Sequence, residues 1–238
     1  MAGLLLAACL TMPPSALAGT LSVSPIRLEM TTAQRSVTLT VRNDGDQPTL
    51  VQASLLAWSQ ADNDEQLQRT DDLLASPPIF TVAPGATQIV RIALRRPPDA
   101  DCERSYRIVV SEVPGKPQPG FNGAQFALKI SLPVFVEAAT AAASPQIEWS
   151  GARTAKGELA LTAFNTGTKH LQLRTVEIAK AGLATDARFA GLLYILAGQR
   201  RTVTIAADAG HAFATDRVQI RADTDAGILA ADVVLDPR

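Results

Sequence analysis

The sequence has few of the residues from which catalytic and metal sites are built. Its 238 residues include two cysteines and two histidines, and aromatic residues make up 5%. Neither His170 nor His211 has a spacing to a serine or cysteine that suggests a nucleophilic triad, and we expect both in surface or loop positions. The acidic run at residues 62–65 lacks the full ligand pattern of a calcium loop. The sequence therefore predicts no enzyme, no cofactor and no metal site.

Charge of one sign and long apolar runs are also lacking. The chain carries 22 basic and 23 acidic residues, so its bulk electrostatics do not favour nucleic acid or an anionic membrane surface. There is no Gly-rich phosphate loop and no basic face interleaved with aromatics. Beyond the N-terminus, no stretch approaches the roughly 20 apolar residues of a membrane span. We expect no nucleic-acid partner and no insertion into a membrane.

The N-terminus has the pattern of an export signal. Residues 4–12 are apolar, and Ala16 and Ala18 form the small-x-small pattern of a cleavage site before Gly19. The basic n-region is missing, which we attribute to a start codon assigned too far downstream. Lipid attachment at Cys9 is disfavoured because the apolar run before it is short. We predict a signal peptide at residues 1–18, after which Cys102 is the only thiol and no intramolecular disulfide can form.

Short apolar alternations separated by turn residues fill the first half of the chain. Pro25 shifts the register of the first alternation, which predicts an edge strand with a kink or a switch between sheets. The polar run at residues 59–72 is expected to be a solvated loop, and the cis or trans state before Pro77 and Pro78 is left open. The predicted strands are 21–30, 36–41, 49–58, 79–80, 87–94, 106–113 and 124–136. Their number and spacing favour an immunoglobulin-like sandwich.

The last of these strands is unusually long. In residues 124–136 the apolar side chains fall on every second position over 13 residues, which would span roughly 40 Å. Strands of five or six residues are the mode in globular proteins. Two interpretations are open: a long central strand of one sandwich, or a strand that lends its apolar row to another protein.

The second half of the chain partly repeats the first. Residues 138–145 are low in structure-forming character and are expected to be a linker between domains at 19–137 and 146–238. Residues 159–164 lead into a turn at 165–167, as residues 36–41 lead into 43–45. We predict a second, smaller β-sandwich, with strands near 147–150, 159–164, 171–178, 192–196, 201–205, 217–222 and 228–234.

Two cations are expected to be neighbours across the ladder. If residues 114–123 connect an antiparallel pair, Arg107 comes opposite about Lys129 or Ile130. Like charges in that position are unfavourable unless an anion joins them. The pair is either a solvated basic pair or a site that captures a carboxylate.

Several short motifs together resemble the periplasmic pilus chaperones of the chaperone–usher pathway. They are PIR at 25–27, SPP at 76–78, APG at 83–85 followed by Val90 and Arg91, EVP at 112–114, and QFALKISLPVFV at 125–136. Each is weak alone, but their order and spacing are specific. The SLPVFV ending resembles the divergent branch that builds archaic or spore-coat-type pili.

The resemblance implies an all-β boomerang, or L shape, of two immunoglobulin-like β-sandwich domains located in the periplasm. Such a chaperone completes pilin subunits that lack a final strand, by donor-strand complementation, and delivers them to an outer-membrane usher. The donor row would be Ala124, Phe126, Leu128, Ile130 and Leu132.

The resemblance also implies an anchor for the client's terminal carboxylate. Arg27 matches the family's arginine, but Pro133 stands where the lysine is usual. If the chain belongs to the divergent branch, the pair of Arg107 and Lys129 would take over the anchoring. The alternative function is a secreted structural or adhesive subunit of a surface assembly, which would be favoured if the apolar row were covered within its own monomer.

Overall fold

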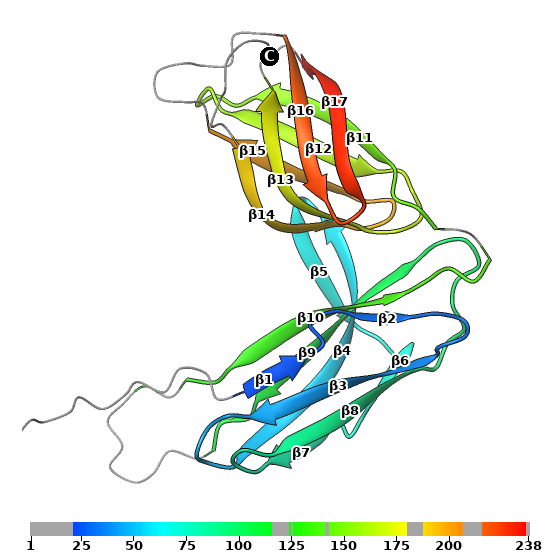
Figure 1. Cartoon of the computed structure of the whole chain (residues 1–238), viewed down its shortest axis with the longest axis vertical. Helices are drawn as coiled ribbons and strands as arrows, with labels where there is room; N and C mark the ends of the chain where they lie inside the picture. Colours follow the sequence, from blue (N-terminus) through cyan, green and yellow to red (C-terminus); the bar gives the residue numbers. More distant parts are fainter. Residues whose placement is uncertain are drawn as a thin grey trace, which may run out of the picture.

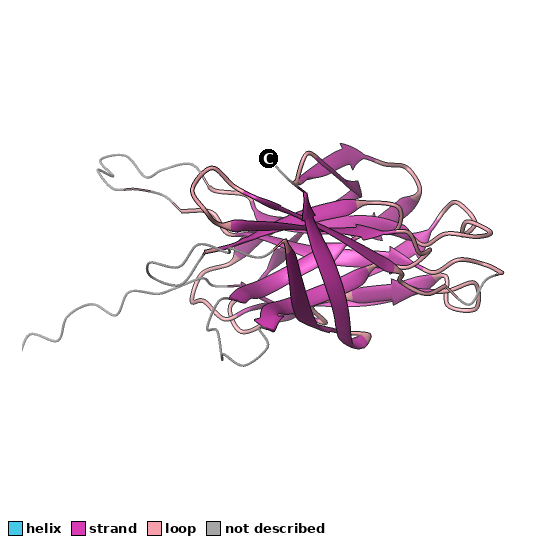
Figure 2. Ribbon diagram, turned by 90° about the horizontal axis from the view of Figure 1, so that it is seen from above, coloured by secondary structure: helices cyan, strands magenta, loops and turns pink. Residues whose placement is uncertain are grey.

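The computed structural model describes residues 21–115, 124, 126–140, 143–179, 188–206 and 216–236. The predicted signal peptide and His211 lie outside these residues. Within the described ranges the chain forms strands, turns and loops and no helix, which confirms the all-β expectation (Figure 2). Figure 1 shows two lobes, one built by β1 to β10 and the other by β11 to β17.

The first lobe packs two sheets face to face. One has the order β1-β3-β8-β6 and the other the order β2-β10-β9-β4-β5, with β7 also paired to β4. Alternate residues of both sheets form its core, which includes Leu39, Ile92, Ile108 and Val134. The strands are β1 (Leu21–Ser24), β2 (Leu28–Met30), β3 (Ser36–Asn43), β4 (Thr49–Ala61), β5 (Asp64–Arg69), β6 (Leu73–Ser76), β7 (Ile79–Val82), β8 (Thr87–Leu94), β9 (Arg104–Glu112) and β10 (Lys129–Val136).

The chain changes sheets at Pro25, which is one of the two outcomes, a kink or a switch, that its register shift predicts. Before it, β1 pairs antiparallel with β3; after it, β2 pairs parallel with β10. The Ser24–Pro25 bond is cis, and so is Ser76–Pro77. The switch places β2 beside the last three residues of β10, Val134–Val136.

The second lobe has its own core between two layers joined through β17. Its strand order is β14-β13-β16-β17-β11-β12-β15, in which β17 is antiparallel to β16 and parallel to β11. Leu161, Leu173, Ile195 and Ile220 lie in this core. The strands are β11 (Ile147–Arg153), β12 (Leu159–Asn165), β13 (Leu171–Ala179), β14 (Arg188–Ile195), β15 (Arg200–Ile205), β16 (Arg217–Thr224) and β17 (Gly227–Asp236).

A buried asparagine stabilises the same turn in each lobe. The Asn43 Nδ2 donates to the carbonyls of Gln47 and Val82, at 2.7 and 2.9 Å, and its Oδ1 accepts from Gly45 N–H. Asn165 repeats this pattern with the carbonyls of Lys169 and Ile195 and with Gly167 N–H. Both asparagines are fully buried. The predicted internal repeat is therefore carried by equivalent hydrogen bonds.

The polar run at residues 59–72 is not a loop. β4 continues to Ala61 and turns directly into β5, a hairpin that reaches toward the second lobe (Figure 1). Asp62 and Asn63 both have positive φ, 51° and 66°, as a two-residue hairpin turn with right-handed twist requires. β5 is exposed throughout and therefore has no apolar alternation from which a strand could be predicted. β6 was not predicted from the sequence either.

The long apolar run forms a shorter strand than predicted. β10 begins at Lys129; Ala124 and residues 126–128 belong to no strand. The reason lies at Glu112, the last residue of β9: its N–H donates to Leu128 C=O, but Leu128 N–H donates to the Glu112 side chain, at Oε2, and not to a backbone carbonyl. Pairing between β10 and β9 therefore begins four residues after the start of the apolar alternation.

Candidate functional site

One side of β10 is open along its first half. β9 flanks all of β10, whereas β2 pairs with Val134–Val136 alone. No described strand pairs with the other side of Lys129 to Pro133. The open edge, as we call this stretch of backbone, is a sheet edge to which another strand can add.

The register assigns the polar backbone groups of this edge. Glu112 N–H donates to Leu128 C=O, so even-numbered residues of β10 direct their backbone groups toward β9. Odd-numbered residues face the other side, as shown by Glu137 N–H donating to Met30 C=O at 2.9 Å. Lys129 and Ser131 therefore present N–H and C=O groups to the open edge. Pro133 has no N–H, and one step further β2 begins.

The predicted donor row changes its surroundings along its length. Ala124 is exposed and Phe126 is 89% exposed, while Leu128 and Ile130 are partly buried against the core of the first lobe. Leu132 is 7% exposed and belongs to that core. The Leu132 side chain is thus covered within its own sandwich, and its part in a donor row stays a prediction. The exposed and partly buried part of the row ends at Ile130.

The expected pair of Arg107 and Lys129 does not form. Arg107 lies opposite Pro133, and Lys129 lies opposite Ser111, so the two cations are separated by four residues along the ladder. The prediction failed because it counted residues 124–128 as ladder. Arg107 is buried: its Nη2 is 2.7 Å from Glu65 Oε1, and its guanidinium lies 3.7 Å above the Trp58 ring. Lys129 is exposed, without an ion pair among the described residues.

Arg27 stands where the open edge meets β2. It directly precedes β2, and its side chain is 37% exposed. Its Nη1 donates to Asp225 Oδ2 at 3.1 Å, and its Nη2 lies 2.9 Å from Glu29 Oε1. Asp225 belongs to the turn between β16 and β17, so this ion pair joins the two lobes.

A buried cluster of polar and aromatic side chains joins the two lobes at Phe135, near the end of β10. The His170 ring stacks on Phe135, with centroids 3.5 Å apart and planes 7° from parallel. Glu103 Oε1 lies 2.7 Å from His170 Nδ1 and accepts the His170 backbone N–H. His170 lies in the loop before β13, one of the two expected positions, but at 4% exposure it is buried and not on the surface. Glu103 and His170 are 67 residues apart, and no spacing in the sequence links them.

The β4–β5 hairpin makes further polar contacts between the lobes. Gln60 Nε2 donates to Tyr194 C=O, and its Oε1 accepts Leu196 N–H. Asn63, in the hairpin turn, donates to Thr202 C=O and accepts Thr202 N–H. These bonds tie the end of β4 and the hairpin turn to the second lobe.

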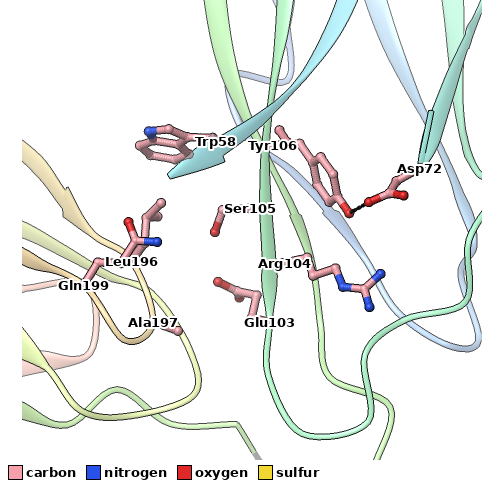
Figure 3. A pocket seen from close by; sticks show the side chains of 10 residues that line it. Trp58, Asp72, Glu103, Arg104, Ser105, Tyr106, Leu196, Ala197 and Gln199 are labelled. Atoms are coloured by element: carbon pink, nitrogen blue, oxygen red, sulfur yellow. Dashed lines mark hydrogen bonds between the residues drawn. The ribbon is translucent and has the colours of Figure 1, made fainter. Parts of the chain in front are cut away.

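A cavity of about 250 Å³ lies beside this cluster, lined by residues of both lobes (Figure 3). Within it the Tyr106 hydroxyl donates to Asp72 Oδ2 at 2.8 Å, and burial together with this carboxylate raises the pKa of Tyr106 to about 12. Nearby, burial raises the pKa of the Cys102 thiol, which keeps it protonated and a weak nucleophile.

Among the described residues no cluster could hold a metal ion. Nor does any helix in the described ranges have the length and apolar character needed to cross a membrane.

Comparison with protein families matches residues 20–141 to the pili and flagellar-assembly chaperones, PapD N-terminal domain. No curated protein matches. Among solved structures, a chain of the CsuC–CsuE chaperone–tip adhesion subunit pre-assembly complex, from archaic chaperone–usher Csu pili of Acinetobacter baumannii, has a TM-score of 0.69. It is 18% identical, and the match covers 92% of this chain and 100% of that one.

Two further structures give the same result. A chain of the Salmonella enterica SafA pilin complex with the SafB chaperone has a TM-score of 0.61 and 19% identity, covering 93% of this chain and 99% of that one. The E. coli chaperone DraB has a TM-score of 0.56 and 23% identity, covering 89% and 97%. These likenesses concern the fold, and they confirm the expectation of two immunoglobulin-like sandwich domains.

Proposed function

The chain belongs to the pili and flagellar-assembly chaperone family, and on that premise we propose that it lends pilin subunits the strand they lack and delivers them to an outer-membrane usher. The observation that carries this proposal is the exposed row ahead of β10 next to the open edge. Phe126 is 89% exposed although it continues an alternation that is buried further along. Such exposure disfavours a structural subunit whose row is covered within its own monomer.

The binding mode that fits the edge is strand addition. Lys129 and Ser131 offer two N–H and two C=O groups in the spacing of a ladder, and Phe126, Leu128 and Ile130 offer alternate apolar side chains. Burying Phe126 and the exposed parts of the other two contributes on the order of 4 kcal/mol before the costs of association. The added strand supplies what an incomplete sandwich needs, a backbone partner and side chains for its groove.

The position of β2 sets the direction and the end of the client strand. β2 runs parallel to β10 and occupies its edge from Val134 onward. A client strand on the same edge must stop near Pro133, since β2 fills the space beyond and Pro133 lacks an N–H. If it runs parallel to β10, as β2 does, its C-terminal end reaches the beginning of β2.

This geometry supports Arg27 as the carboxylate anchor. Arg27 is the residue just before β2, so its guanidinium lies where a parallel client strand ends. An arginine binds a carboxylate through two parallel N–H donors, which favours a free C-terminus over a continuing chain. Arg107 is engaged with Glu65 and Trp58, and Lys129 lies four residues upstream, so neither is required as anchor.

The boundaries proposed for the chain rest on the sequence patterns at residues 1–18 and 138–145, and the family match over residues 20–141 is consistent with them. We infer a signal peptide at residues 1–18, a donor-strand domain at 19–137, a linker at 138–145 and a second domain at 146–238, with export to the periplasm. The start of the linker packs on the first domain: Ala139 and Thr140 N–H donate to Asp99 and Ala100 C=O. The second domain holds the position of Asp225 and closes the site on one side.

Co-expression with a pilin-like subunit from the same genome, followed by native mass spectrometry of the periplasmic extract, tests the proposal. We expect a one-to-one complex with the native chain and none when Phe126 and Leu128 are both replaced by Asp. The matched control carries Leu74→Asp and Ile89→Asp, which alter apolar residues that are 51% and 57% exposed in the other sheet. A complex that survives the first pair of substitutions, or is lost equally with the second, would contradict donor-strand binding through this row.

A further inference from the structure

Both terminal nitrogens of Arg27 already hold carboxylates of the same chain. Nη1 donates to Asp225 and Nη2 is paired with Glu29. A bidentate pair with an incoming carboxylate needs two of the guanidinium donors in one plane. A client that ends at Arg27 therefore meets an occupied group and two negative charges beside it.

Asp225 is the better fixed of the two carboxylates. Its Oδ1 accepts Gln172 N–H at 2.8 Å and its backbone N–H donates to Gln172 C=O at 3.0 Å, so its Oδ2 is held toward Arg27. The Asp225 side chain is 20% exposed and that of Glu29 43%. Because the exposed pair with Glu29 is screened by water, it competes less with a client than Asp225 does.

We propose that Asp225 is an internal substitute for the client's terminal carboxylate, so that docking is an exchange of one carboxylate for another on Arg27. This inference rests on the proposed function, because it requires a client strand that ends at β2. In the free protein Asp225 neutralises Arg27 and links the two lobes. When a client docks, its carboxylate takes the Nη1 donor, and Asp225 keeps its bonds to Gln172.

The exchange has a consequence for selectivity. A client that ends in a free carboxylate forms an ion pair with Arg27 in place of the one with Asp225. The net free-energy cost of breaking the Arg27–Asp225 pair is therefore small. A strand whose end carries no charge displaces nothing and leaves the Arg27–Asp225 pair intact. The affinity for the first kind is thus reduced by competition with Asp225, and the affinity for the second is independent of it.

The test uses a peptide that copies the last strand of a pilin-like subunit from the same genome, as the free acid and as the C-terminal amide. Binding of each to the full chain is measured by calorimetry. Asp225→Asn keeps an oxygen for Gln172 N–H and removes the charge; Asp223→Asn, on the same hairpin but 3.7 Å from Arg174, is the matched control. We expect Asp225→Asn to lower the Kd of the acid three- to tenfold and to leave that of the amide unchanged.

The ratio of the two Kd values within one variant cancels any loss of folded protein. In an Arg27→Ala background the ratio should be near one, and Asp225→Asn should no longer change it. An unchanged or weakened preference for the acid in Asp225→Asn, or the same gain with Asp223→Asn, would overturn the exchange while leaving strand addition intact. Failure of the native chain to bind either peptide would overturn both proposals.

Discussion

The two ends of residues 124–136 have the same alternation of apolar side chains and opposite surroundings. At the far end Val134 and Val136 are buried in the core of the first lobe, and the backbone there lies between β9 and β2. At the near end Phe126 is 89% exposed and lies in no strand. Between them, the backbone N–H and C=O groups of Lys129 and Ser131 face the open edge, where no described strand pairs with them.

The difference shows that an apolar alternation specifies which side chains share a face, but not what covers that face. The far end is covered by the chain's own second sheet, and the near end, at Phe126, is exposed. We therefore expect equivalent substitutions at the two ends to affect different properties, stability at one and client capture at the other.

The largest expected effect is on stability. Val134→Asp would bury a charge with no partner in the core, so we expect the free energy of unfolding to fall by at least about 4 kcal/mol. Phe126→Asp, at an exposed position, should change it by less than about 0.5 kcal/mol. Urea denaturation followed by tryptophan fluorescence measures both. Similar losses in the two variants would mean that Phe126 is covered in solution.

Alanine substitutions along the row should show the crossover between the two properties. We expect Phe126→Ala to weaken client binding about 30-fold, by about 2 kcal/mol, at unchanged stability. Leu132→Ala should lower stability by about 2–3 kcal/mol and leave binding by the folded protein nearly unchanged. Competition binding and urea denaturation are the two measurements. A binding loss at Leu132 as large as that at Phe126 would return Leu132 to the donor row.

Proline substitutions separate the two sides of the β10 backbone. Ser131→Pro removes an N–H that has no acceptor on the open edge, so we expect little loss of stability and about tenfold weaker client binding. Pro133, which already faces this side, shows that the ring is tolerated there. Leu132→Pro, the matched control, removes an N–H that pairs with β9 and should destabilise the fold. Client binding that is unaffected by Ser131→Pro would argue against backbone pairing at this edge.

The smallest expected effect is at Lys129. Its side chain is exposed, forms no ion pair with the described residues and lies four residues from Pro133, where we propose that the client strand ends. We expect Lys129→Ala to change client binding less than twofold at low and at moderate salt, because exposed charges contribute little. A loss of tenfold or more would identify Lys129 as the second anchor.

Features set by local chemistry could be predicted from the sequence. The alternation in β8 gave its bounds, Thr87–Leu94, and Pro25 gave the switch between sheets. The recurring Asn-x-Gly turn gave the repeat that Asn43 and Asn165 confirm with equivalent bonds. In each case neighbouring residues determine the backbone, so the signal lies within a few positions.

Features set by distant contacts could not be predicted. The register of β9 and β10 depends on where their connection ends, and an offset of a few residues moved Arg107 from Lys129 to Pro133. The β4–β5 hairpin is polar because it is solvated and bonded to the second lobe, so it carries no apolar alternation. His170 is buried by Phe135 and Glu103, which come from the other lobe.

Hydrogen exchange at the backbone of β10 tests the central claim most directly. In the free protein the amides of Lys129 and Ser131 should exchange fast, while those of Ile130 and Leu132, which face β9, should be protected. In the complex with a pilin-like subunit we predict that Lys129 and Ser131 become protected by at least about 100-fold, as ladder hydrogen bonds require. Fast exchange of both amides in a stable complex would show that the client does not add its strand to this edge.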